Sequence, residues 1–168
     1  MKRTFLSVMI LLTFVSCQDK VMYVDNTKLL NEYQEKIDLE NSLQKKIDAY
    51  SRKRDSISRV FQLEAQQFES QAQSLGQAVA QKKYNELMQK SQMLQQHLMQ
   101  EEQAIQSESQ SKMDTLLTKV KKFVKEYGKN KGYTYILGAN EGGSVLYGTD
   151  SKNITDDVVK ALNDNYKK

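Results

Sequence analysis

Proline is absent from the 168 residues, and cysteine and histidine occur once each. Because proline is the residue that breaks helices most strongly, its absence allows long helices between Thr27 and about Tyr127. The lone Cys17 excludes an internal disulfide and leaves the rest of the chain without a thiol for nucleophilic or redox chemistry. His97 lies in a Gln- and Met-rich stretch without a metal-binding cluster and is expected to face solvent. With no nucleotide-binding motif in the sequence, we expect a protein that is not an enzyme and needs no cofactor or metal.

Long hydrophobic runs are also missing, apart from a short one near the N-terminus. It extends from Phe5 to Val15, about 11 residues where a membrane-spanning helix needs about 20, and it follows Lys2 and Arg3. These features predict a secretory signal peptide over residues 1–16, which is cleaved from the mature chain.

The residues Phe14-Val15-Ser16-Cys17 resemble a bacterial lipobox, with Phe14 where leucine is usual. The resemblance implies that Cys17 is diacylated and becomes the new N-terminus. Residues 17–20 would then be a tether, and the chain would be held on a membrane through its lipid anchor. An ordinary signal peptide followed by an incidental cysteine is the alternative.

Charged residues make up 27% of the chain and mean hydropathy is −0.69, which favours an extended body without a large single core. Loss of Lys2 and Arg3 with the signal peptide lowers the formal net charge from +4 to about +2, a weak excess that does not indicate a nucleic-acid partner. Positive charge is concentrated between Lys45 and Arg59. This stretch is either a solvated helix face or a docking strip for anionic partners or lipid head groups.

A helical hairpin is expected over residues 27–127, with its turn near Gly76. Apolar residues recur at three- and four-residue steps along both arms, which would reach roughly 75 Å at about 50 residues per arm. Arg, Glu, Gln and Ser interrupt these positions, so we expect arms that are flexible or splayed and stabilised mainly at their base. The register of the returning arm shifts by one residue near its end, which predicts at least one irregularity there.

The residues on either side of the hairpin predict a small body over residues 21–26 and 128–168. Val21–Val24 is predicted as a buried strand, and Asn26 or Thr27 can cap the first helix.

The returning arm is expected to end at Gly128, a helix stop. Strands are expected at residues 133–137 and 145–147, joined by a glycine-rich hairpin connection. A last helix follows Asn153, its predicted cap. The predicted fold class is therefore α+β, a small β-strand body with a long protruding α-helical hairpin and a C-terminal helix.

Several of these segments together resemble the Skp (OmpH-like) family of periplasmic chaperones. The resemblance covers essentially all of the mature chain, and its most specific part is C-terminal, where Asn153 stands in place of the usual aspartate. The residues that carry it are Tyr23-Val24-Asp25, Val145-Leu146-Tyr147 and Asn153-Ile154-Thr155 with the helix that follows to Leu162-Asn163.

The resemblance implies a homotrimer in the periplasm of a Gram-negative bacterium, with three hairpin arms around a cavity. Such a protein would hold unfolded outer-membrane proteins between its arms without using ATP. Weakly packed amphipathic arms could hold an unfolded chain through many shallow contacts. The candidate contact residues are Arg52, Lys53, Arg54, Arg59, Phe61, Phe68, Met88 and Met93.

A second function remains open, that of a structural or adaptor lipoprotein of the envelope. Its coiled-coil arms would bridge the membrane to one folded partner, which a pull-down would recover. A pull-down with a holdase would instead recover heterogeneous unfolded clients.

Overall fold

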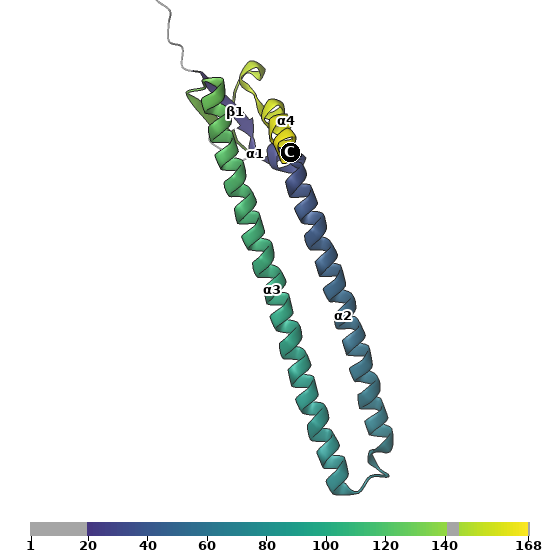
Figure 1. Cartoon of the computed structure of the whole chain (residues 1–168). Coiled ribbons are helices and arrows are strands. Elements are labelled where there is room, and N and C mark those ends of the chain that lie inside the picture. The colour runs from purple at the N-terminus through teal and green to yellow at the C-terminus, as the bar shows by residue number, and fades with distance from the viewer. Residues whose placement is uncertain (1–19, 141–144, 168) are drawn as a thin grey trace, which may run out of the picture. The chain divides into compact units, whose positions relative to one another are not determined.

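The computed structural model describes residues 20–140 and 145–167 (Figure 1). The predicted signal peptide, Cys17 and most of the glycine-rich connection lie outside these residues. The chain divides into two compact units, which we call the sheet unit and the hairpin unit. The sheet unit comprises the described residues up to Glu32 and from Lys121 onward, and the hairpin unit is Tyr33–Val120.

The order of elements bears out the predicted α+β class, with a small sheet, two long helices and a C-terminal helix. The elements are β1 (Val21–Asp25), α1 (Asn26–Glu32), α2 (Gln34–Ala72), α3 (Gln77–Lys131), β2 (Tyr135–Ala139), the 3-10 turn η1 (Asp150–Lys152) and α4 (Thr155–Tyr166).

In the sheet unit, β1 and β2 pair in parallel, from Val21 opposite Tyr135 to Asp25 opposite Ala139. Both strands therefore begin at the same end of the unit. The predicted strand over Val21–Val24 is confirmed, although only Val24 in it is buried. Around Val24 the buried apolar side chains are Leu29, Ile154, Val158, Val159 and Leu162.

The first helix is capped by a different residue from those predicted. The carboxylate of Asp25 accepts hydrogen bonds from the amides of Thr27 (2.8 Å) and Lys28 (3.0 Å), so Asp25 is the cap rather than Asn26 or Thr27. The helix was also expected to continue into the arm, but it breaks at Tyr33, whose backbone is extended (φ −76°, ψ 115°). The side chain of Tyr33 is buried, and its hydroxyl donates to Glu35.

The end of α3 also differs from the prediction. The helix continues through Gly128, and the residue after its end, Gly132, has φ +70°. The amide of Gly132 donates to Lys129 O (3.1 Å) and that of Tyr133 to Gly128 O (2.9 Å), the two bonds of a Schellman ending. Gly128 is instead buried against Ile136, where an added Cβ would lie 3.0 Å from Cδ1.

The strand predicted at residues 145–147 does not form in the single chain. Leu146 and Tyr147 are 94% and 86% exposed, and no strand of the described chain lies beside them. At the edge of β1, Tyr23 is instead bridged by Asn153.

Candidate functional site

The two arms of the hairpin unit are joined by four ion pairs between α2 and α3, which we call the cross-arm ladder. They are Glu35–Lys119 (2.5 Å), Lys46–Glu108 (2.6 Å), Lys53–Glu101 (2.6 Å) and Glu64–Lys90 (2.5 Å). From one pair to the next the step is eleven, seven and eleven residues on both arms. The arms therefore keep one constant antiparallel register from near their open end to near the turn.

These steps correct the predicted irregularity in the returning arm. Eleven and seven residues together make five turns at 3.6 residues per turn, so the paired side chains stay on one face of a straight helix. The helix α3 is continuous over 55 residues. The eleven-residue step from Glu108 to Lys119 spans the place where the apolar register shifts, so the shift reflects this spacing and not a break.

The order of charges on the ladder specifies this register. Along α2 the paired residues are Glu, Lys, Lys and Glu, and along α3 they are Lys, Glu, Glu and Lys. A slip of eleven residues would place Lys46 opposite Lys119 and Glu64 opposite Glu101. Because like charges in contact are destabilising, the sequence disfavours that alternative.

Lysines of the ladder, together with the neighbouring Lys112, also change the acidity of its carboxylates. Hydrogen bonds from Lys112 and Lys46 lower the pKa of Glu108 to about 2. Partial burial raises the pKa of Glu35, but hydrogen bonds from Lys119 and Tyr33 outweigh it and leave the pKa below its ordinary value. These carboxylates are therefore charged at neutral pH.

Burial is confined to the open end of the hairpin unit, which we call its base. Tyr33, Leu43, Leu116 and Val120 are buried, whereas no residue from Gln44 to Lys112 is. Along this distal part the seam is only half-buried, as at Tyr50, whose hydroxyl donates to Leu98 O (3.2 Å). The burial pattern thus agrees with arms that are stabilised mainly at their base.

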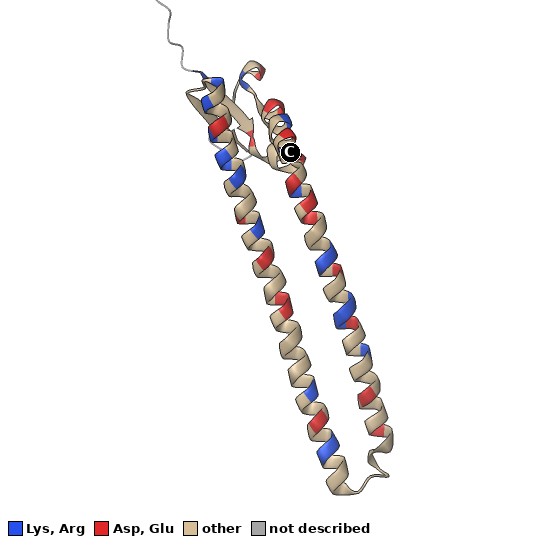
Figure 2. Ribbon diagram, in the orientation of Figure 1, with Lys and Arg blue, Asp and Glu red and all other residues tan. Residues whose placement is uncertain are grey.

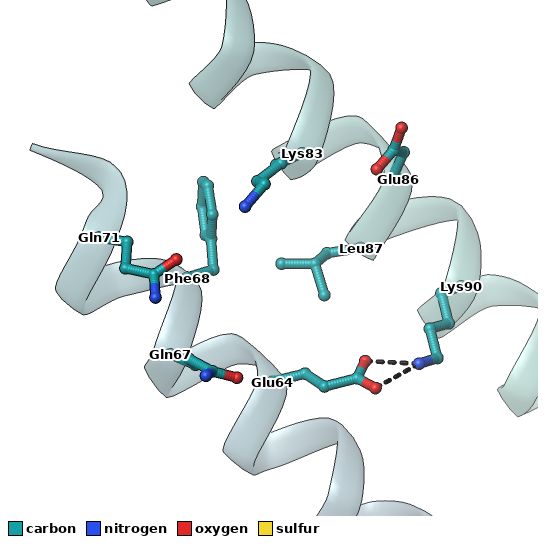
Figure 3. Close-up of a pocket in the computed structure, with 8 residues that line it drawn as sticks. All are labelled: Glu64, Gln67, Phe68, Gln71, Lys83, Glu86, Leu87 and Lys90. Carbon is teal, nitrogen blue, oxygen red and sulfur yellow. Dashed lines mark hydrogen bonds and ion pairs between the residues drawn. The ribbon is translucent and has the colours of Figure 1, made fainter. Parts of the chain in front are cut away.

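Two cavities open between the arms in the distal part. One, of about 290 Å³, lies near the turn and is drawn in Figure 3, where Phe68 and Leu87 face each other and the Glu64–Lys90 pair lies beside them. The other, of about 440 Å³, has an apolar lining of Ile47, Tyr50 and Ile105, among polar residues that include Arg54 and Glu102. Each cavity therefore combines a few apolar side chains with a larger number of polar and charged ones.

The structure does not gather the eight predicted contact residues in one place. Phe68 lines the cavity near the turn, and Phe61 is half-buried. Lys53 belongs to the ladder, and Arg54 pairs with Asp55 (3.1 Å). The others, all exposed, are Arg52, Arg59, Met88 and Met93.

Sequence reasoning missed the second cavity and several exposed apolar residues. Val60 and Leu63 lie in the basic stretch of α2 and are 52% and 59% exposed. The sequence did contain a signal for this exposure, because Val60 and Leu63 do not fall on the three- and four-residue steps that the other apolar residues follow.

Within residues 20–140 and 145–167, no cluster of His, Cys, Asp and Glu is suited to a metal ion. None of the helices in that part is long and apolar enough to cross a bilayer. His97 is exposed, with Nε2 3.8 Å from Glu101 and 3.5 Å from Lys53 Nζ.

A family model described as "Outer membrane protein (OmpH-like)" matches residues 20–162. Among solved structures, the chain is similar to a candidate outer membrane chaperone (OmpH-like) from Caulobacter crescentus, at a TM-score of 0.78 and 13% identity. The match covers 88% of this chain and 85% of the other. No curated protein matches the chain.

Proposed function

Because the chain belongs to the OmpH-like family of outer membrane proteins, we propose that it is an ATP-independent holdase chaperone. Its clients would be unfolded outer-membrane proteins crossing the periplasm of a Gram-negative bacterium. The similar Caulobacter structure, itself described as a candidate outer membrane chaperone, supports the same role.

The observation that carries this proposal is the apolar surface of the distal arms. Large apolar side chains are exposed along both helices of a segment that has no buried core. They are Ile47, Val60, Leu63, Val79, Tyr84, Met88, Met93 and Met99. Such residues are interspersed with charge, which keeps the arms in solution while leaving many small apolar contacts available. The three methionines add flexible side chains that adapt to irregular partners.

The cavities between the arms would add to this surface. The cavity near the turn offers the apolar side chains of Phe68 and Leu87 among polar and charged ones. An apolar side chain of an extended client could enter it while the client backbone remains near polar groups. Many weak contacts of this kind would hold an unfolded chain without selecting one sequence.

The proposal includes a homotrimer assembled through the sheet unit. Tyr135 and Leu137 of β2 are exposed, as are Leu146 and Tyr147. Within the described residues, one edge of β2 has no strand beside it. An unpaired strand edge that lies next to exposed apolar side chains favours pairing with another chain. A monomeric mass in solution would exclude the trimer and the cavity between its arms.

The test uses the full mature chain with Cys17→Ser, which removes the predicted acylation site and keeps every described residue. A denatured outer-membrane β-barrel is diluted into it, and light scattering follows aggregation. We expect a discrete soluble complex. Aggregation at a stoichiometric excess of the chain would refute the holdase, and one defined folded partner in pull-downs would favour the adaptor lipoprotein.

Two variants then separate apolar from charged contacts. Leu63→Gln, Met88→Gln and Met93→Gln together remove exposed apolar groups of the distal arms, and Arg52→Gln with Arg59→Gln removes exposed charge. We expect the first variant to lose most of the aggregation suppression at physiological salt. Equal suppression by the first variant and the parent chain would show that these side chains do not hold the client.

A further inference from the structure

The exposed apolar surface of the distal arms differs in its chemistry between the two helices. On α2 its large side chains are Ile47, Val60 and Leu63, and α2 contains no methionine. On α3 from Asn85 onward, all of which the structure describes, each exposed large apolar side chain is a methionine. These are Met88, Met93 and Met99, which are 45%, 63% and 54% exposed. The returning arm thus presents thioethers where the first arm presents hydrocarbon.

The middle of α3 has no charged side chain that could bind a client instead. Residues 91–100, which include Met93 and Met99, contain no Asp, Glu, Lys or Arg, and Figure 2 shows this stretch as a tan segment of α3. Its other apolar residues, Leu94 and Leu98, are half-buried. Methionine therefore supplies most of the apolar surface that this stretch presents to solvent.

Met88 and Met99 lie on the face of α3 that points away from α2. They are eleven residues apart, about three turns of helix, as are Lys90 and Glu101 of the cross-arm ladder. Each methionine precedes its ladder residue by two positions, which is about 200° around the helix. Because the ladder residues face α2, a chemical change at either of these sulfurs can leave the ladder intact.

Apart from the thiol of Cys17, methionine is the side chain of this protein that a peroxide oxidises most readily, since the sequence has no tryptophan. Hydrogen peroxide transfers one oxygen atom to the thioether sulfur. The O–O bond breaks, an S–O bond forms, the sulfur loses two electrons and water leaves. The product, methionine sulfoxide, is polar, so an apolar contact with a client would be lost.

We propose that Met88, Met93 and Met99 form an oxidation site at which a peroxide reversibly weakens client binding by α3. The inference rests on the proposed holdase and adds a means of regulating it. The aliphatic side chains of α2 do not react in this way, so client binding is weakened and not abolished. Methionine sulfoxide reductases, one for each sulfoxide epimer, would restore the thioether. With a dithiol as reductant, the oxygen leaves as water and the dithiol becomes a disulfide.

The experiment uses the full mature chain with Cys17→Ser, so that no thiol reacts. The chain is treated with hydrogen peroxide, which is then removed, and peptide mass spectrometry locates the oxygen gained at each methionine. A fluorescently labelled outer-membrane β-barrel is diluted from denaturant to a concentration too low for it to aggregate. Its fluorescence anisotropy, measured as the chain is added, gives the apparent Kd.

Two variants separate the exposed methionines from the others. The test variant is Met88→Leu/Met93→Leu/Met99→Leu, which keeps apolar side chains but removes the sulfur. Its control is Met22→Leu/Met113→Leu, which changes two half-buried methionines. Each variant is compared with itself before and after peroxide, so that any change in the Kd of its reduced form does not enter the result.

We expect peroxide to oxidise the three exposed methionines before Met22 and Met113, because oxidation follows exposure. Loss of an apolar contact the size of one methylene weakens binding about fourfold, so three sulfoxides should raise the Kd at least about tenfold in the parent and the control. In the test variant the Kd should not change. Equal oxidation rates at exposed and half-buried methionines, or the same rise of Kd in the test variant, would each overturn the proposal.

Two further readouts make the result specific. Circular dichroism should show equal helicity before and after oxidation, and a loss would overturn the proposal, because the arm itself would then have unfolded. Treatment with the two reductases and dithiothreitol should restore the thioethers and the original Kd. A Kd that stays high, or an oxygen that the reductases do not remove, would overturn the reversibility.

The same titration distinguishes failure of the oxidation site from failure of the holdase. A reduced parent that does not bind the client would refute the holdase and the oxidation site together. A parent that binds the client equally well before and after oxidation would refute only the oxidation site.

Discussion

The base and the distal part of the hairpin unit differ in what stabilises them. At the base, Tyr33, Leu43, Leu116 and Val120 are buried. The distal part, from Gln44 to Lys112, has no buried residue and contains three of the four ladder pairs. Fully burying a large apolar side chain contributes about 1.5–3 kcal/mol, whereas an exposed ion pair contributes about 0–1 kcal/mol. The buried side chains at the base therefore supply most of the stability. The ion pairs of the distal part mainly fix the register of α2 against α3.

This difference suits the holdase that we propose, in which the arms accept irregular partners. Regions with few buried contacts open at low free-energy cost while the rest of the fold stays intact. In such a holdase, the constant spacing of the ladder would let the distal arms return to the same register after opening. A fully packed seam would resist opening and would cover the apolar side chains that a client needs.

The largest expected effect comes from removing a buried apolar side chain at the base. Leu116 is 2% exposed, and Leu116→Ala should lower the free energy of unfolding by about 2–5 kcal/mol, because it removes buried contacts and leaves a cavity. Leu87→Ala, at a half-buried distal position, is the matched control and should cost less than half as much. Urea unfolding followed by circular dichroism measures both. Equal losses would mean that the two parts are stabilised alike.

A smaller effect is expected from reversing one charge of the ladder. Lys53→Glu replaces the pair with Glu101 by two like charges and should destabilise the distal arms by about 1 kcal/mol at low salt. Adding Glu101→Lys restores opposite charges and should recover most of the loss. Hydrogen exchange should show faster opening around Lys53 with the base unchanged. A variant that loosened the base equally would argue against independent parts.

Acid should weaken the ladder at Glu108. The pKa of Glu108 in the folded hairpin is about 2, below its ordinary value of 4.5, so the folded state binds this proton less readily than the unfolded one. Its contribution is complete above pH 4.5 and is lost as the pH falls toward 2. Stability of the parent and of Glu108→Gln, measured by urea unfolding from pH 5 to pH 2, should converge at the acid end. Parallel curves would exclude this carboxylate from the acid response.

Local sequence signals predicted the elements of this fold better than their boundaries. The absence of proline and the apolar steps identified two long helices, and Val21–Val24 identified β1. The end of α3 was misplaced because Gly128 and Gly132 are equally good local stops. Only the packing of Ile136 against Gly128 and the positive φ of Gly132 distinguish them.

The candidate site was harder to predict, because it too depends on contacts between residues that are far apart in the sequence. Phe68 could be chosen by its size and spacing, and it does line a cavity. The pairs of the ladder could not be predicted, because Lys46 and Glu108 are 62 residues apart and only the fold brings them together. Strand 145–147 was predicted from residue type, but a strand also needs a partner strand, and within the described residues this segment pairs with neither β1 nor β2.

The smallest expected effect concerns the turn end of the distal part. Gly76 precedes α3, and its carbonyl accepts hydrogen bonds from the amides of Val79 and Ala80 (3.0 Å each). Its φ is not positive, and a Cβ there would meet no atom within 4 Å. Serine at this position can cap the helix with its hydroxyl, so Gly76→Ser should stabilise the turn by a few tenths of a kcal/mol.

The same substitution at Gly132 is the control and should act in the opposite direction. At φ +70° a side chain is strained, so Gly132→Ser should cost about 1–2 kcal/mol. If the distal part opens independently of the base, Gly76→Ser should slow hydrogen exchange near the turn and leave the urea midpoint of the whole chain almost unchanged. A clear rise of that midpoint would mean that the turn and the base unfold as one unit, which would remove the physical basis for arms that open around a client.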